Sequence, residues 1–172
     1  MNYHEKKTLL TSVVGLIVLL SYIIYAINVY YEGTVESLAL KFWATKILIF
    51  VGVGVISIVI ALVIFHILYS IYLSIKLKTE NKDMTDNEIE EIVSQMIETD
   101  TFEDEMAKLI GLKAMRIGFA FAGVGFVLSL ISLLLNYSPI IMINILYLSF
   151  GLGAVVEGFV QVYYFRKGIN HV

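Results

Sequence analysis

The sequence predicts an all-α fold: an integral membrane four-helix bundle with a cytoplasmic helical segment between the second and third membrane-spanning helices. Hydrophobic residues make up 59% of the 172 residues and charged residues only 16%. A soluble domain has about 25% charged residues and could not bury so much apolar surface. Four apolar stretches are each long enough to span a hydrocarbon core of about 30 Å. The acidic residues gather in one segment between the second and third stretches.

The same composition excludes several classes of protein. It does not fit a plain soluble enzyme, a disordered tail or a nucleic-acid-binding module, so the lipid bilayer is an expected partner and nucleic acid is not. The chain contains no cysteine, which excludes a disulfide framework, a thiolate metal site and a thiol nucleophile.

The four predicted spans cover approximately residues 8–30, 43–75, 117–135 and 140–165. The first has no charged residue inside it and is longer than the apolar core of a signal peptide. The second is too long for one perpendicular crossing, so we expect it to tilt or to continue as helix beyond the bilayer. The spans divide the chain into helices 1 and 2 (1–77), an acidic helical segment (78–113) and helices 3 and 4 (114–172).

A short Asn-Tyr-Ser-Pro turn separates the third span from the fourth. Ser138 is the predicted N-cap of the fourth helix, and Pro139 fits its first helical position. So short a connection makes the third and fourth helices antiparallel neighbours.

Lysine and arginine residues predict the orientation of the chain in the cell membrane. If the N-terminus is cytoplasmic, ten of the twelve basic residues lie inside and only Lys41 and Lys46 lie outside. Because cytoplasmic loops carry the excess of lysine and arginine, we expect a multi-pass protein with both termini and the long central segment in the cytoplasm.

The central segment is strongly acidic but has the pattern of a helix. Residues 80–105 contain eleven acidic residues and one lysine. Thr85 and Glu88 have the spacing of a capping box. Ile89, Ile92, Val93, Met96 and Ile97 follow at the spacing of an amphipathic helix. We expect residues 99–101 to interrupt this helix and a second one to run from Phe102 into the third span.

Two interpretations of this segment remain open. Its apolar face can pack onto the cytoplasmic ends of the spans while the acids are simply solvated, or its acids can form a docking surface for a partner. A calcium site is not expected, because the acids lack the spacing and the glycine of an EF-hand loop. The candidate partner-binding residues are Glu88, Glu91, Glu98, Glu103, Asp104 and Glu105.

A short stretch before the third span resembles a family of proteins. It contains Glu103-Asp104-Glu105, then Lys108-Leu109-Ile110, then Lys113-Ala114, Arg116 and Ile117. These residues are similar to an uncharacterised family of small bacterial and archaeal four-helix membrane proteins, which carry a Glu-Asp-Glu-Arg type motif before the third transmembrane helix. The sequence departs from that motif at Met106, where the family has arginine. The resemblance implies the four-helix architecture but no activity.

Polar side chains inside the predicted spans are candidates for a second site, because burying them in lipid is costly. Glu157 lies about 14 Å from Arg166 along its helix, and His66 lies about 15 Å from Lys76. The two side chains are therefore expected at similar depth and can meet if their helices touch. Gln161 follows Glu157 on one helix face, and Ser70 follows His66 on another. Such a site could join helices, carry protons or ions, or bind a small ligand or lipid headgroup.

Pairs of small residues four positions apart predict close helix contacts, within one chain or in a homodimer. They are Gly118 with Ala122, Ala154 with Gly158, and Ser57 with Ala61.

The sequence predicts a small non-enzymatic membrane protein that binds a cytosolic protein or another membrane subunit through its acidic segment, in a regulatory, sequestering or accessory role. The alternative is a proton- or ion-linked transporter or channel, or a ligand-binding protein, that uses Glu157 and His66. We expect no enzymatic activity, cofactor or metal, because the sequence has no metal-ligand triad, no catalytic triad at one depth and no phosphate-binding loop.

Overall fold

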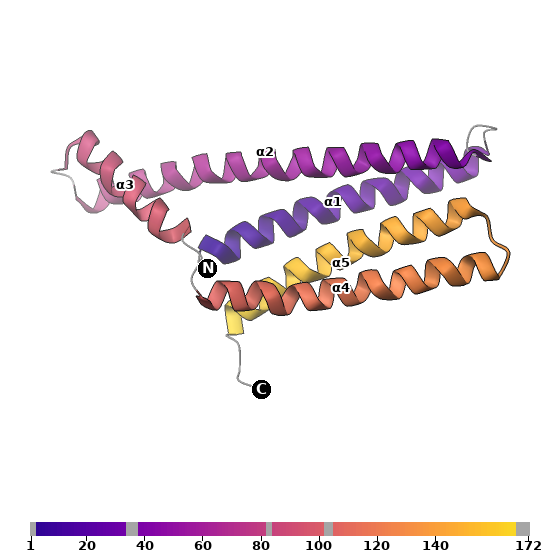
Figure 1. Ribbon diagram of the computed structural model, residues 1–172. Coiled ribbons are helices and arrows are strands. Elements are labelled where there is room, and N and C mark those ends of the chain that lie inside the picture. Colours follow the sequence, from indigo (N-terminus) through magenta and orange to yellow (C-terminus); the bar gives the residue numbers. More distant parts are fainter. Residues whose placement is uncertain (1–2, 34–37, 82–83, 102–104, 168–172) are drawn as a thin grey trace.

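A computed structural model describes residues 3–33, 38–81, 84–101 and 105–167. Within these ranges the chain is all-α, as predicted, and each predicted span lies in one long helix (Figure 1). Four of the helices are long and apolar enough to cross a membrane. The helices are α1 (Tyr3–Glu32), α2 (Leu40–Glu80), α3 (Asp86–Thr101), α4 (Glu105–Leu134) and α5 (Pro139–Lys167).

The four long helices lie side by side, and the short helix α3 lies at one end of them (Figure 1). That end, called the α3 end below, also holds the start of α1 and the last residues of α5. The opposite end, called the turn end, holds the α4–α5 connection. Helices α4 and α5 pack along each other, α1 packs on α5, and α2 packs on α1.

Small residues explain why α4 and α5 approach so closely. The buried positions of α4 recur every three or four residues, as expected for one face of a helix, and most are glycine, alanine or serine. They are Ala107, Ile110, Ala114, Gly118, Ala122, Gly125, Ser129 and Ser132. The predicted pair Gly118 and Ala122 is therefore a helix contact, and α5 lies against it.

Helix α2 is longer than a bilayer is thick. Its 41 residues correspond to about 60 Å of helix, against a hydrocarbon core of about 30 Å. Residues 43–75 lie within this one continuous helix, which extends past the other helices at the α3 end (Figure 1).

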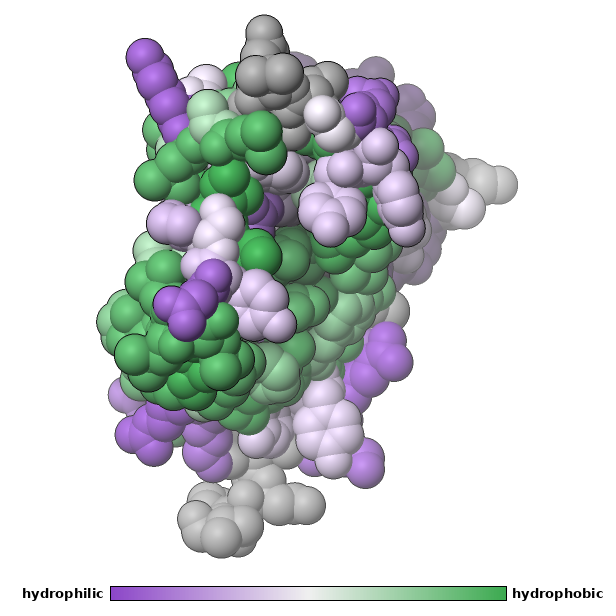
Figure 2. Space-filling view, turned by 90° about the vertical axis from the view of Figure 1, so that its right-hand side faces the viewer, coloured by the Kyte–Doolittle hydropathy of each residue, from purple (hydrophilic) through white to green (hydrophobic). Residues whose placement is uncertain are grey.

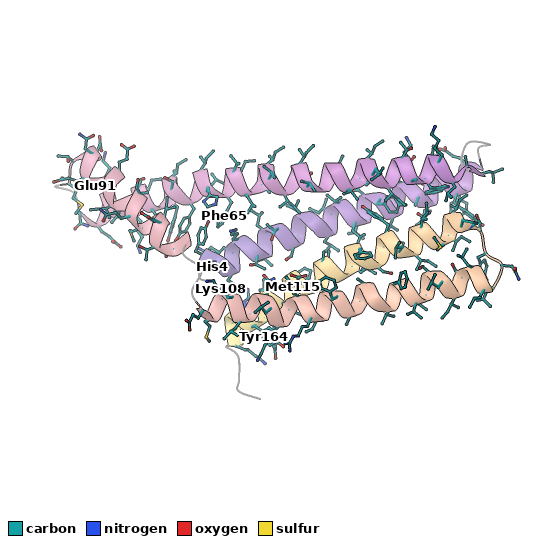
Figure 3. All side chains as sticks on the ribbon, in the orientation of Figure 1. His4, Phe65, Glu91, Lys108, Met115 and Tyr164 are labelled. Atoms are coloured by element: carbon teal, nitrogen blue, oxygen red, sulfur yellow. The ribbon has the colours of Figure 1, made fainter. Side chains whose placement is uncertain are left out.

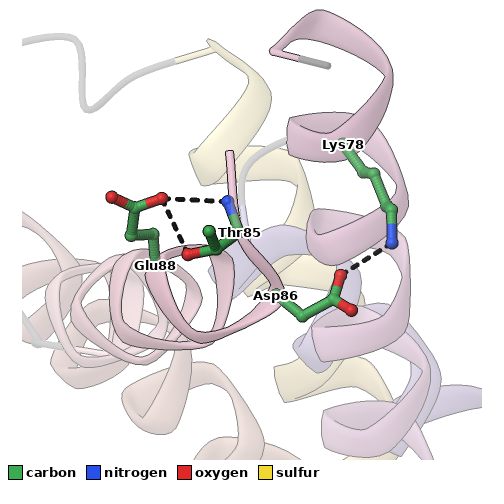
Figure 4. Close-up of polar contacts among 4 residues, drawn as sticks. All are labelled: Lys78, Thr85, Asp86 and Glu88. Atoms are coloured by element: carbon green, nitrogen blue, oxygen red, sulfur yellow. Dashed lines mark hydrogen bonds and ion pairs between the residues drawn. The ribbon is translucent and has the colours of Figure 1, made fainter. Parts of the chain in front are cut away.

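The apolar face of α3 is buried against this end of α2. Ile89 and Val93 of α3 and Leu73 of α2 form one buried cluster. The Tyr69 hydroxyl donates to Asp100 at 2.6 Å, and Lys78 pairs with Asp86 at 2.7 Å (Figure 4). The packing interpretation of this segment is therefore confirmed for its apolar face.

The predicted interruption at residues 99–101 is wrong, because α3 continues to Thr101. Two contacts explain the continuation. The Thr99 hydroxyl donates to the carbonyl of Gln95 inside the helix instead of capping a new one, and Asp100 accepts the hydrogen bond from Tyr69. The next described helix, α4, begins at Glu105, and Phe102 lies outside the described residues.

The α4–α5 turn is built as its sequence predicts. Asn136 takes a left-handed conformation with φ 61°. The N–H of Tyr137 donates to the carbonyl of Ser132, and that of Asn136 donates to Leu133, which is a Schellman motif. The Ser138 hydroxyl then accepts the N–H of Ile140 at 3.2 Å and caps α5.

The outer surface of the four long helices is apolar. Side chains such as Leu48, Ile56 and Leu68 of α2 are more than half exposed. Figure 2 looks onto the turn end and shows hydrophobic side chains (green) over much of its centre and lower left, with strongly hydrophilic ones (purple) fewer. Large apolar side chains exposed along all four long helices are typical of a protein that is surrounded by lipid.

Candidate functional site

Glu157 lies about two thirds of the way along α5, where it contacts α4. A Cβ atom added to Gly118 would lie 2.9 Å from the Glu157 carboxylate oxygen Oε2 and 3.1 Å from its Cβ, so the glutamate side chain fills the space that this glycine leaves open. On its own helix, Glu157 Oε1 accepts a hydrogen bond from Gln161 at 3.3 Å. The structure therefore brings together Glu157 and Gln161, two of the four predicted intramembrane residues.

His66 lies elsewhere, in an aromatic cluster with the first turn of α1. The Tyr3 hydroxyl lies 3.1 Å from His66 Nε2, and the Tyr3 ring also contacts the rings of Phe65 and Tyr69. Figure 3 labels Phe65 on α2, close to the start of α1. Within the described residues, no hydrogen bond or ion pair joins His66 to Glu157. The predicted partnership of these two side chains is not observed.

Ser70, the fourth predicted intramembrane residue, is also separate from Glu157. It lines a cavity of about 470 Å³ between α2 and α3, together with Ser74, Lys78, Glu90 and Ser94. This cavity lies at the α3 end, next to the contact between the two helices. Ser70 therefore belongs to the surroundings of the acidic segment.

Glu157 and Gln161 line a groove of about 370 Å³ between α1, α2 and α5. Near them lie the hydroxyl groups of Thr8, Thr11 and Ser12 from α1. The rest of the lining is almost entirely apolar and comes from all three helices: Gly15, Val18, Leu19, Phe50, Val51, Gly54, Val55, Ile58, Tyr147, Gly151, Ala154, Val155 and Gly158. A mostly apolar cavity with a few polar groups at one place is the usual form of a small-molecule site.

The candidate partner-binding acids of α3 all point into solvent. Glu88, Glu91 and Glu98 are exposed, and Glu105 is exposed in the first turn of α4. Glu91 is labelled in Figure 3 and lies far from the α4–α5 turn. The other two candidates, Glu103 and Asp104, lie outside the described residues.

Half of the predicted capping box forms at the start of α3: the Glu88 carboxylate reaches back to the backbone N–H of Thr85. The Thr85 N–H and hydroxyl both donate to the Glu88 carboxylate, at 2.9 and 2.8 Å (Figure 4). The backbone hydrogen bond, followed by the hydroxyl one, lowers the pKa of Glu88 below its ordinary value of 4.5. The hydrogen bond and positive charge of Lys78 likewise lower the pKa of Asp86.

These lowered pKa values predict a loss of order at the start of α3 in acid. A carboxylate whose pKa is lowered by folding stabilises the folded state above the pKa of the unfolded chain, and this contribution disappears as the pH falls through the folded pKa. We expect amide-exchange protection of residues 84–90 to be constant near neutral pH and to decrease below about pH 4. The Asp86→Asn/Glu88→Gln double variant should lose this pH dependence; an unchanged profile would contradict the assignment.

The sequence analysis missed a polar contact at the start of α1. Glu5, which is only 5% exposed, forms an ion pair with Arg166 from the last turn of α5. The pair joins the two ends of the chain that lie at the α3 end. A single acid directly before Lys6 and Lys7 gives no periodic signal in the sequence, so only the packing of α1 on α5 reveals this ion pair.

A second missed contact lies toward the turn end. The Tyr22 hydroxyl donates to the side-chain oxygen of Asn144, and the Tyr22 ring packs against Tyr147 and Phe50. Tyr22 is fully buried. The sequence feature that could have predicted this contact is Asn144 within an apolar helix, because such a side chain needs a hydrogen-bond partner.

Comparisons with known proteins give no relative: no family model, no curated protein and no solved structure matches the chain. The resemblance of the Glu103-to-Ile117 stretch to a membrane protein family therefore stays a prediction.

Proposed function

We propose that this chain is a non-enzymatic, multi-pass protein of the cell membrane that binds a partner through the exposed acids of α3. The observation that supports it best is the burial of Ile89 and Val93 against Leu73. Because Ile89 and Val93 are already buried inside the molecule, the surface that α3 offers to a partner is mostly acidic and polar, with Met96 also exposed. The four long apolar helices support the membrane location.

The chemistry of α3 suits a basic partner. Glu88, Glu91 and Glu98 are exposed acids on one short helix, and complementary charge speeds the encounter of two proteins and selects between partners. Anionic lipid headgroups would repel this helix. The partner is thus a cytosolic protein, or a segment of another membrane subunit, with a lysine- or arginine-rich surface, and the role is regulatory, sequestering or accessory.

The proposed orientation places α3 in the cytoplasm. The start of α1, all of α3 and the end of α5 lie at one end of the bundle, and the basic residues Lys6, Lys7, Arg166 and Lys167 lie at that end. By the positive-inside rule this end faces the cytoplasm.

Cysteine labelling tests the orientation directly, because the chain has no cysteine of its own. A Glu91→Cys variant should react with a membrane-impermeant maleimide only after the cells are permeabilised. A Glu32→Cys variant, whose residue is exposed at the turn end, should react in intact cells. The opposite labelling pattern would mean that α3 lies outside the cell, which would contradict both the proposed topology and a cytosolic partner.

Site-specific crosslinking tests the partner. A photoreactive amino acid at position 91 should give a discrete protein adduct in cells, and the same residue at position 32 should not give it. Changing Glu88 and Glu98 to glutamine should weaken that adduct, and raising the salt concentration in membrane preparations should weaken it further, because exposed charges are screened. If the adduct is insensitive to both changes, the acidic face is not the binding surface.

A further inference from the structure

The groove between α1, α2 and α5 is divided into a polar and an apolar part. Thr8, Thr11 and Ser12 of α1, with Glu157 and Gln161 of α5, form its part toward the α3 end. The part toward the turn end is lined by side chains such as Val18, Leu19, Phe50 and Val51. A ligand that fits both parts is amphiphilic, with its polar group directed toward the α3 end.

The shape of the groove favours a single extended chain. Its lining on α5 runs from Tyr147 to Gln161, which is about 21 Å of helix. A volume of about 370 Å³ spread over that length describes an elongated groove, whose shape suits an extended chain. Val51 and Val55, on the α2 side of the groove, are 45% and 59% exposed, so the groove is open toward the surrounding lipid.

The polar part offers hydrogen-bond acceptors. The Ser12 and Thr11 hydroxyls donate their protons to the Thr8 carbonyl inside α1, at 2.7 and 3.0 Å. Their oxygen lone pairs remain to accept hydrogen bonds. The Glu157 carboxylate is a further acceptor, and the Gln161 amide already donates to it. A headgroup with several N–H donors can form hydrogen bonds to these oxygen atoms, whereas a headgroup that contains only hydrogen-bond acceptors cannot.

The ionisable side chains of the groove also favour a headgroup with N–H donors. Glu157 is the acidic side chain of the groove, and among the described residues that line it there is no lysine, arginine or histidine. A carboxylate inside an apolar region is stabilised by a cation that also hydrogen-bonds to it. An anionic headgroup would be repelled, and a neutral one would leave the carboxylate without a counter-charge.

We propose that this groove binds a single-chain amphiphile with a protonated amine headgroup, taken from the bilayer. The ammonium group contacts Glu157 and the hydroxyls of α1, and the hydrocarbon chain lies along the apolar part between α1, α2 and α5. This site is separate from the exposed face of α3, so it stands whether or not α3 binds a protein.

Matched probes with the same chain test the headgroup. The protein is placed in phosphatidylcholine nanodiscs and labelled with a photoreactive dodecylamine, and adducts are mapped by mass spectrometry. We expect saturable adducts on groove residues such as Leu19, Val55 and Val155. Unlabelled dodecylamine should compete at least about tenfold better than dodecanol or dodecanoate, because only the amine forms the charge-assisted hydrogen bond.

Two variants keep the proposal falsifiable. Glu157→Gln should weaken binding of the amine by about tenfold or more, whereas Glu32→Gln, at an exposed acid outside the groove, should not change it. Gly54→Leu should block the apolar part with Glu157 intact, since the Gly54 position faces the groove with Val18 as its nearest neighbour at 3.5 Å. Adducts spread evenly over the lipid-facing surface of α2, or equal competition by all three probes, would show partitioning into the bilayer only and overturn the proposal.

Discussion

Replacing Gly153 with alanine is expected to destabilise the protein by about 1–3 kcal/mol, because the added methyl group overpacks the α4–α5 contact. A Cβ atom at Gly153 would lie 2.6 Å from the backbone carbonyl oxygen of Gly118. A flexible side chain could move away, but a helix backbone cannot move unless the two helices separate. Gly118→Ala should also be destabilising, because a Cβ atom at Gly118 would lie 3.0 Å from the Gly153 carbonyl oxygen.

Gly123 on α4 provides the matched control. Nothing lies within 4 Å of a Cβ atom added there, so Gly123→Ala should be neutral or stabilising by up to about 1 kcal/mol through helix propensity. Reversible unfolding in mixed detergent micelles, followed by circular dichroism, compares the variants. Equal stability of Gly153→Ala and Gly123→Ala would mean that α4 and α5 are not in backbone contact.

Much of this fold could be predicted because helix length and polarity are local properties. The four long helices, the Ser138 cap and the hydrogen bond from the Thr85 N–H to Glu88 each depend on a few neighbouring residues, and each is present as expected. The error at residues 99–101 has a tertiary origin. Asp100 resembled a helix start, but Tyr69 from α2 supplies a hydrogen-bond donor that keeps it inside α3.

The candidate site was harder to predict because depth along a helix does not determine its neighbours. Counting residues placed His66 and Glu157 at similar depth. Helices α2 and α5 do touch, but which side chains meet depends on how the faces of the two helices are turned. Gly151 and Gly158 bring α5 against Leu19 and Ser12 of α1. The start of α1 then packs on α2, where Tyr3 contacts His66. Glu157 instead lies against Gly118 of α4, accepts a hydrogen bond from Gln161 and lines the groove.

Truncating Arg166 to alanine is expected to destabilise the α3 end by about 1–3 kcal/mol, because it leaves the Glu5 carboxylate buried without this partner. The Glu5 side chain is 6% exposed, whereas that of Arg166 is 57% exposed. The exposed arginine is easily solvated when its partner is removed. Glu5→Gln should therefore cost less than Arg166→Ala. Both variants can be measured by the unfolding assay, and the reverse order would contradict the proposed asymmetry.

Exchanging the two charges distinguishes the stability contributed by the ion pair from that contributed by the helix dipoles at Glu5 and Arg166. Glu5 lies in the first turn of α1 and Arg166 in the last turn of α5, where the helix dipoles favour an acid and a base respectively. The Glu5→Arg/Arg166→Glu variant restores opposite charges but reverses both dipole interactions, each worth about 0.3–1 kcal/mol. It should recover only part of the stability lost in Arg166→Ala. Full recovery would assign the whole effect to the pair, and no recovery would assign it to the dipoles and to packing of the arginine side chain.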